Sequence, residues 1–196
     1  MSVLKRFSFF ILPPIFQGVL SLIILPLTTN ILGPREYGIF AFASSLAAFG
    51  TVIASMGASY VTAAHYQISD VSERKHIVMS VLFTGFFLSI VFSVVILLLW
   101  PFFASHWAVF REVSRRIVFI SLSSMVLGIP WIFVTDMLML EGKASRFAYV
   151  QIAQSVASFL ATIGALYLFH LDIFSLFIGQ FVAGFIAAMG SIKTFL

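Results

Sequence analysis

The chain has 196 residues, of which 61% are hydrophobic and only 9% are charged, and its formal net charge is +4. A soluble domain carries about 25% charged residues and cannot hide so much apolar surface, so the composition excludes an ordinary water-soluble domain. It predicts an all-α polytopic membrane protein, and the absence of cysteine excludes disulfides and thiol chemistry.

Two long apolar stretches, at about 8–31 and 38–63, flank a short polar break near the N-terminus. Each is long enough to cross a bilayer, which takes about 20 apolar residues. Gly33 is expected to end the first helix in the left-handed conformation, and Pro34 cannot continue its hydrogen bonding. The pattern predicts a membrane hairpin with a tight turn at the depth of the lipid headgroups. The break reads Leu32-Gly33-Pro34-Arg35-Glu36-Tyr37-Gly38.

Four further spans are predicted downstream, at about 77–100, 117–140, 147–169 and 173–192. Asp70-Val71-Ser72-Glu73 has the spacing of a capping box, so the third helix is expected to begin before its apolar part. Trp100 and Trp107 mark the opposite membrane interface, where Pro101 is expected to close this helix. No hydrophilic linker is long enough to define a second domain, so residues 1–196 are expected to form one six-helix lobe.

The lysines and arginines are distributed unevenly between the two sides of these spans. The inside residues are Lys5, Arg6, Arg74, Lys75, Lys143, Arg146 and Lys193, and the outside residues are Arg35, Arg111, Arg115 and Arg116. Seven against four favours cytoplasmic N- and C-termini by the positive-inside bias, although the cluster at 111–116 opposes it. The cations could also attract a pyrophosphate or contact lipid headgroups, and nothing indicates a nucleic-acid partner.

Asp136 is the only charged residue well inside a predicted span. An unpaired carboxylate in hydrocarbon costs at least about 2.5–3.5 kcal/mol, so such a residue usually faces a bundle interior or a wet cavity. Asp136 is therefore a candidate for a substrate path. The alternative is an interfacial position, because the Glu141-Gly142-Lys143 turn lies only about 7–8 Å further along the helix. Asp136 would then pair with Lys143 or water.

Pro130 stands one and a half turns before Asp136 and is expected to kink the fourth span, because it removes a backbone donor and frees the carbonyl of Val126. In transporters such kinks often line cavities, since freed carbonyls need partners. A packing kink without function is the alternative. Small residues at helical spacing in the second and sixth spans, including Gly50 and Gly179, predict close helix packing.

A polar stripe occupies one face of the fifth span: Gln151, Gln154, Ser155, Ser158 and Thr162. Gln17 begins a shorter counterpart in the first span, followed by Ser21 and Thr28. These groups could hydrogen-bond the hydroxyl groups of a polar cargo in a hydrated cavity. The alternative is that they connect helices, with each contact contributing about 0.6 kcal/mol.

The first turn carries a longer pattern that extends upstream. A basic pair, Lys5-Arg6, precedes the first span, which ends in Pro26-Leu27-Thr28-Thr29-Asn30-Ile31-Leu32-Gly33-Pro34-Arg35-Glu36-Tyr37-Gly38. This pattern resembles the polysaccharide exporters of the multidrug/oligosaccharidyl-lipid/polysaccharide (MOP) superfamily, the Wzx-type O-antigen flippases and their relatives. The resemblance covers essentially the whole chain and is strongest over 1–60 and 140–154.

The resemblance implies a MATE-like six-helix lobe, the N-terminal half of a flippase of the bacterial inner membrane. By this implication the cargo is an undecaprenyl-pyrophosphate-linked oligosaccharide, moved across the membrane by alternating access during synthesis of a surface polysaccharide such as the O-antigen of lipopolysaccharide. Family members carry about twelve to fourteen spans in two lobes. The chain is therefore expected to be truncated, or to pair with a separately encoded lobe or a second copy.

Two other interpretations stay open: an ion-coupled multidrug exporter of the same superfamily, and a non-transporting scaffold or gene remnant. The exporters tend to place a carboxylate inside the first span, and this span has none. Enzyme chemistry is not expected, because the sequence lacks a nucleophile elbow, a Walker loop and a zinc-protease motif. No metal or cofactor is expected either, since His65, His76, His106 and His170 lie at span ends without a ligand partner at helical spacing.

Overall fold

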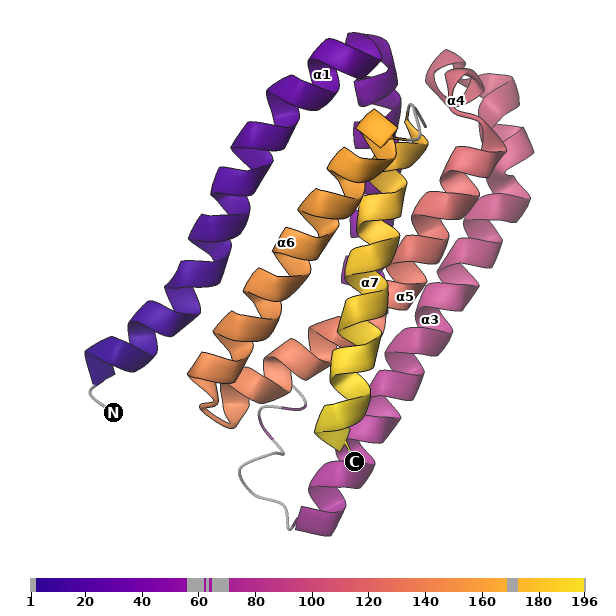
Figure 1. The fold of residues 1–196 in the computed structure, drawn as a ribbon. Helices are drawn as coiled ribbons and strands as arrows, with labels where there is room; N and C mark the ends of the chain where they lie inside the picture. The colour runs from indigo at the N-terminus through magenta and orange to yellow at the C-terminus, as the bar shows by residue number, and fades with distance from the viewer. Residues whose placement is uncertain (1–2, 56–61, 63, 65–70, 169–172, 196) are drawn as a thin grey trace. The chain divides into compact units, whose positions relative to one another are not determined.

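The computed structural model describes residues 3–55, 62, 64, 71–168 and 173–195. Every regular element in this part of the chain is an α-helix (Figure 1). The helices are α1 (Val3–Ser55), α3 (Val71–His106), α4 (Ala108–Glu112), α5 (Arg115–Leu140), α6 (Ala144–Leu168) and α7 (Phe174–Phe195). They form two compact units, Met1–Gly38 with Val134–Leu196 and Ile39–Phe133, so α1 and α5 each contribute to both.

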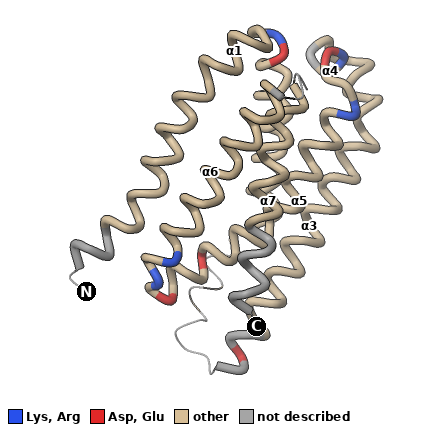
Figure 2. The backbone as a smooth tube through the Cα atoms, viewed as in Figure 1, with Lys and Arg blue, Asp and Glu red and all other residues tan. Residues whose placement is uncertain are grey.

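Among the described residues, four helical stretches are long and apolar enough to cross a membrane: Ser8–Ser55, His76–His106, Arg115–Leu140 and Ala144–Tyr167. The last helix, α7, adds a shorter apolar stretch, Phe174–Ile186. Charged residues of the described part gather near helix ends (Figure 2), which keeps them out of hydrocarbon. The prediction of an all-α polytopic membrane protein is confirmed.

The polar break of the sequence interrupts the long helix α1 at Gly33. This residue has φ 79° and ψ 162°, outside the helical region, in a conformation that residues with a side chain rarely adopt. Pro34 follows directly, and its fixed φ suits the start of the next helical stretch. Its missing N–H costs no hydrogen bond, because the first residue of a helix has no intrahelical acceptor. The predicted helix end at Gly33 is therefore confirmed, but the expected left-handed helical conformation is wrong, because ψ is 162° rather than about 47°.

The helix α3 begins earlier and ends later than its apolar part. It starts at Val71, which confirms the predicted extension, although the proposed cap Asp70 lies outside the described residues. The expectation that Pro101 closes the helix is wrong, because α3 continues to His106. The reason is local: Arg111 donates hydrogen bonds to the carbonyls of Ala104 and Ser105 and so holds the last turn in place.

The unit Ile39–Phe133 is held together by close packing of small residues against large ones. A Cβ at Gly50 would lie 2.5 Å from both Met125 Sδ and Phe92 Cε1, so a larger residue would require these side chains to shift. The Ser121 hydroxyl of α5 donates a 2.8 Å hydrogen bond to the carbonyl of Ala43 in α1. A buried core is formed by Ala54, Ile129 and Phe133, with Val81, Leu82, Leu88 and Ile132 packed against it.

In the other unit, a tight turn joins the end of α5 to α6. The amide of Lys143 donates to the carbonyl of Leu138, and that of Gly142, whose φ is 67°, donates to Met139. The rings of Phe10 and Phe147 lie 5.4 Å apart, which fastens the start of α1 to α6. The helices α6 and α7 pack along each other (Figure 1).

Candidate functional site

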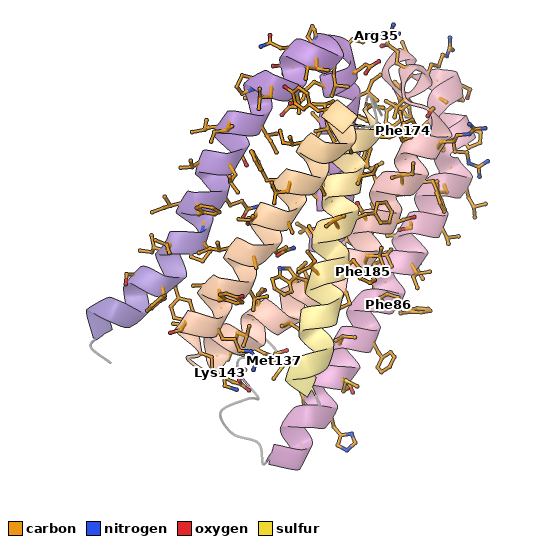
Figure 3. The ribbon with its side chains drawn as sticks, in the orientation of Figure 1. Arg35, Phe86, Met137, Lys143, Phe174 and Phe185 are labelled. Carbon is orange, nitrogen blue, oxygen red and sulfur yellow. The ribbon has the colours of Figure 1, made fainter. Side chains whose placement is uncertain are left out.

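Asp136 lies near the end of α5, four residues before Leu140. Its side chain is half-buried, and it has an interaction partner within the chain. Met137 and Lys143 mark this end of the unit in Figure 3. The Lys143 ammonium lies 2.6 Å from a carboxylate oxygen of Glu141. Asp136 stays a candidate for the substrate path, with an interfacial position as the alternative.

Pro130 lies inside α5, which continues without interruption to Leu140. Its ring nitrogen cannot donate to the carbonyl of Val126, so the helix is weakened at this turn. Four residues later, at Val134, α5 passes from one compact unit into the other. The weakened turn therefore adjoins the place where the helix changes units, and the expected kink stays a prediction.

The second half of the α6 stripe contacts α7. Ser158 donates a 2.9 Å hydrogen bond to the carbonyl of Gly179, and Thr162 donates one of 2.9 Å to the carbonyl of Ser158. A Cβ placed on Gly179 would overlap the Thr162 hydroxyl oxygen, and Thr162 is only 4% exposed. At these two positions the geometry supports the helix-connecting interpretation.

The first half of the stripe is different in chemistry and surroundings. The Ser155 hydroxyl is bonded within α6, to the carbonyl of Gln151 at 2.9 Å. Gln151 and Gln154 are both half-buried and stand three residues apart, on one helical face. Each amide offers two donors and an acceptor, which suits the recognition of hydroxyl groups. These two side chains are the stronger path candidates of the five.

Gln17 is exposed on α1, and its carbonyl accepts a 2.9 Å hydrogen bond from the hydroxyl of Ser21. Its neighbours on the same helix are exposed and apolar, with Ile15 at 60% and Leu22 at 72%. A primary amide on such a face is costly in hydrocarbon unless something bonds it. Gln17 thus marks a position on α1 that a polar partner would stabilise.

Metal-binding geometry is absent from the residues that the structure describes, where no three histidine or carboxylate side chains gather. Two of the four histidines, His65 and His170, lie outside those residues.

The structure shows a cluster of aromatic rings with Arg111 at the end of α3. In the sequence, only Trp100 and Trp107 indicated this region. At the end of α3, aromatic rings stack around α4, and the Arg111 guanidinium binds the last carbonyls of α3. Sequence reasoning placed the tryptophans at an interface but could not show that the rings and the arginine form one structure, since the contacts depend on the chain reversal at α4.

The apolar helices and the charges at their ends define the class: a polytopic α-helical membrane protein. A family model described as polysaccharide biosynthesis protein matches residues 3–195. The chain therefore belongs to this family, that of the Wzx-type polysaccharide flippases of the MOP superfamily, whose members are transporters. Searches of curated proteins and of solved structures found no match. The match confirms the resemblance carried by the turn at Gly33 and its flanking residues.

Proposed function

We propose that the chain is the N-terminal lobe of a transporter that moves undecaprenyl-pyrophosphate-linked oligosaccharide units across the bacterial inner membrane for surface polysaccharide synthesis. The observation that carries this proposal is the family match over residues 3–195, nearly the whole chain. The long apolar helices agree with it, because a polar sugar crosses hydrocarbon only along a path built by membrane-spanning protein.

The path residues in this proposal are Asp136, Gln151 and Gln154, with Gln17 on α1. Amides and a carboxylate bind sugar hydroxyls by hydrogen bonds, which replace the water that the sugar loses on entering the membrane. A second six-helix lobe, from the same or another chain, would cover the other side of the path, as in two-lobe transporters that work by alternating access. Both termini of this lobe lie in the cytoplasm in this proposal.

The test uses the gene as it occurs in its bacterium. Deletion should abolish the surface polysaccharide and cause the lipid-linked repeat unit to accumulate, measured by mass spectrometry of extracted lipids. Accumulation separates a transport defect from loss of an assembly enzyme, after which the intermediate would be missing. Reintroducing the intact gene is the control. Full surface polysaccharide in the deletion strain, or loss without accumulation, would contradict the proposal.

A further inference from the structure

A patch of aromatic rings with one arginine stands at the end of α3, within the unit Ile39–Phe133. It consists of Phe102, Phe103, His106, Trp107, Phe110 and Arg111, and is called the aromatic–arginine patch. We infer that this patch lies in the interfacial layer of the bilayer and that Arg115 and Arg116, which follow it in the chain, bind the phosphate-bearing headgroups of anionic lipids there. The inference is independent of the proposed transport function.

The rings of the patch form one connected structure with exposed faces. The centroids of Phe102 and His106 lie 4.3 Å apart, and Trp107 lies 5.7 Å from Phe103 and 5.8 Å from Phe110. Phe102 is 54% exposed and Trp107 is 51% exposed. Amphipathic rings of this kind are favoured at the boundary between hydrocarbon and headgroups, where one face meets acyl chains and the polar edge meets water.

The patch is fixed to the helices beneath it. Phe110 contacts Phe42 of α1 at 5.2 Å and the buried Trp100 of α3 at 5.3 Å between ring centroids. The Arg111 guanidinium donates to the carbonyls of Ala104 and Ser105 at 2.9 and 2.8 Å. These carbonyls belong to the last turn of α3, which has no helical donors of its own. The aromatic faces are therefore presented by a rigid support.

The position of the patch along α3 matches the edge of the hydrocarbon. An exposed apolar stripe precedes it, in which Phe83, Phe87, Val94 and Leu98 are 64%, 65%, 48% and 70% exposed. No charged residue occurs between Lys75 and Arg111. From Phe83 to Phe102 the helix rises by about 28 Å, close to the roughly 30 Å thickness of a bilayer core. Acyl chains along this stripe would bring the headgroups to the patch.

The positive charge at the start of α5, next to the patch, favours binding of an anion. Arg115 and Arg116 are exposed in the first turn of α5, where the helix dipole is already positive, so two cations there are unfavourable by themselves. Glu112 is the one acidic residue between His106 and Arg116. A phosphate would offset this excess through charge-assisted hydrogen bonds. A soluble phosphate compound would leave Trp107 and Phe102 in water, which is why the structure favours a lipid as the source.

The test reads the fluorescence of Trp107 in the full chain with Trp100→Phe and Trp131→Phe, reconstituted in phosphatidylcholine vesicles containing phosphatidylglycerol. Bromines near the headgroup end of the acyl chains should quench Trp107 more than bromines near the methyl end. At equal mole fraction, brominated phosphatidylglycerol should quench severalfold more than brominated phosphatidylcholine. Arg115→Gln with Arg116→Gln should remove this preference, as should high salt, whereas Arg35→Gln should preserve it.

The inference would be overturned by no quenching from either lipid, by strongest quenching from the methyl end, or by equal quenching from the two lipids. Retained preference for phosphatidylglycerol after loss of both arginines would do the same. If free pyrophosphate abolishes the preference at low millimolar concentration, the site binds soluble phosphate and the lipid assignment is wrong.

A second measurement applies if the double tryptophan variant fails to insert. A spin label on Ala108→Cys in the cysteine-free chain reports the same depth. Equal access to oxygen and to a water-soluble nickel chelate is expected there, and access to only one of them overturns the interfacial position.

Discussion

Asp136 lies in the last turns of α5. Its side chain is half-buried and interacts with another group of the chain. A carboxylate so placed costs free energy unless water or polar groups surround it, so the path role and the interfacial position both require polar surroundings for Asp136. The nearest basic residue along the chain, Lys143, has Glu141 as its ion-pair partner.

Asp136→Asn is expected to reduce export of surface polysaccharide severalfold while the amount of protein in the membrane stays near wild type. Asparagine keeps the shape and part of the hydrogen bonding but loses the charge. Quantifying surface polysaccharide by gel and the protein by immunoblot would check this. Asp136→Ala with unchanged polysaccharide length and amount would refute the path role.

Gly179→Ala is expected to destabilise the protein, because the added Cβ overlaps the Thr162 hydroxyl at the α6–α7 contact. Overpacking of this kind costs about 1–3 kcal/mol. Thermal unfolding in detergent should show a lower midpoint for this variant. Gly164→Ala is the matched control, since a Cβ there meets nothing within 4 Å. Thr162→Ala should relieve much of the effect of Gly179→Ala, and purely additive effects would rule out the proposed overlap.

Among the elements, α1 shows how one residue divides a helix. Its two stretches are long and apolar, and between them only Gly33 leaves the helical conformation. Four prolines lie within the element, yet Pro13, Pro14 and Pro26 do not interrupt it. A proline inside a membrane helix is tolerated when neighbouring groups satisfy the freed carbonyl, whereas a positive φ ends the hydrogen-bond pattern itself.

Gly33→Ala is therefore expected to cost about 1–3 kcal/mol, because φ 79° with ψ 162° is a backbone conformation that essentially only glycine adopts. The added atom would meet nothing within 4 Å, so backbone conformation is the sole cause. Unfolding midpoints of Gly33→Ala and Gly18→Ala provide the comparison. Gly18 lies inside the helix with equally open surroundings, and alanine there should be neutral or stabilising. Equal destabilisation by both changes would argue against the turn.

The polar stripe of α6 has two halves: Gln151 and Gln154 are candidates for the substrate path, whereas Ser158 and Thr162 pack against α7. Single cysteines at Gln151 and Gln154 should react with a small membrane-impermeant thiol reagent if the path is hydrated. A cysteine at Ser158 should react little, because that side chain contacts Gly179. A cysteine at the 61% exposed Leu160 should be shielded by lipid. The native chain has no cysteine to interfere, and equal labelling at all four positions would contradict a one-sided path.

At the scale of the whole molecule, one of the two compact units combines segments that are distant in sequence. One unit joins the start of α1 to the chain after Val134, and the other is continuous from Ile39 to Phe133. Charged residues lie near helix ends and turns in both units (Figure 2), and exposed apolar side chains lie along the helices of both. This distribution is that of a protein whose helices cross a bilayer and whose turns lie in the headgroups and water.

The proposed orientation predicts different labelling from the two sides of the membrane. In intact spheroplasts a cysteine replacing Ala108 should react with an impermeant maleimide, while one replacing Ser145 should react only after the membrane is opened. Both positions are exposed, so access to the side of the membrane decides the result. Labelling of Ser145→Cys alone in closed spheroplasts would reverse the assigned topology.

The sequence by itself determined the class, the family and the turn at Gly33. Composition shows that so apolar a chain needs a membrane, and glycine followed by proline stops a helix whatever packs around it. The early end assigned to α3 at Pro101 was wrong because the turn after it is held by Arg111, a contact between residues up to seven positions apart. Local sequence rules do not include such a contact.

Only the tertiary structure decided which polar residues of α6 connect helices. Periodicity placed all five on one face, since a helix brings residues three and four apart together. It could not show that Gly179 of α7 lies against Ser158 and Thr162, because that contact depends on how two helices are aligned. The same holds for the aromatic–arginine patch, whose rings come from α3 and α4 and meet only because the chain reverses between them.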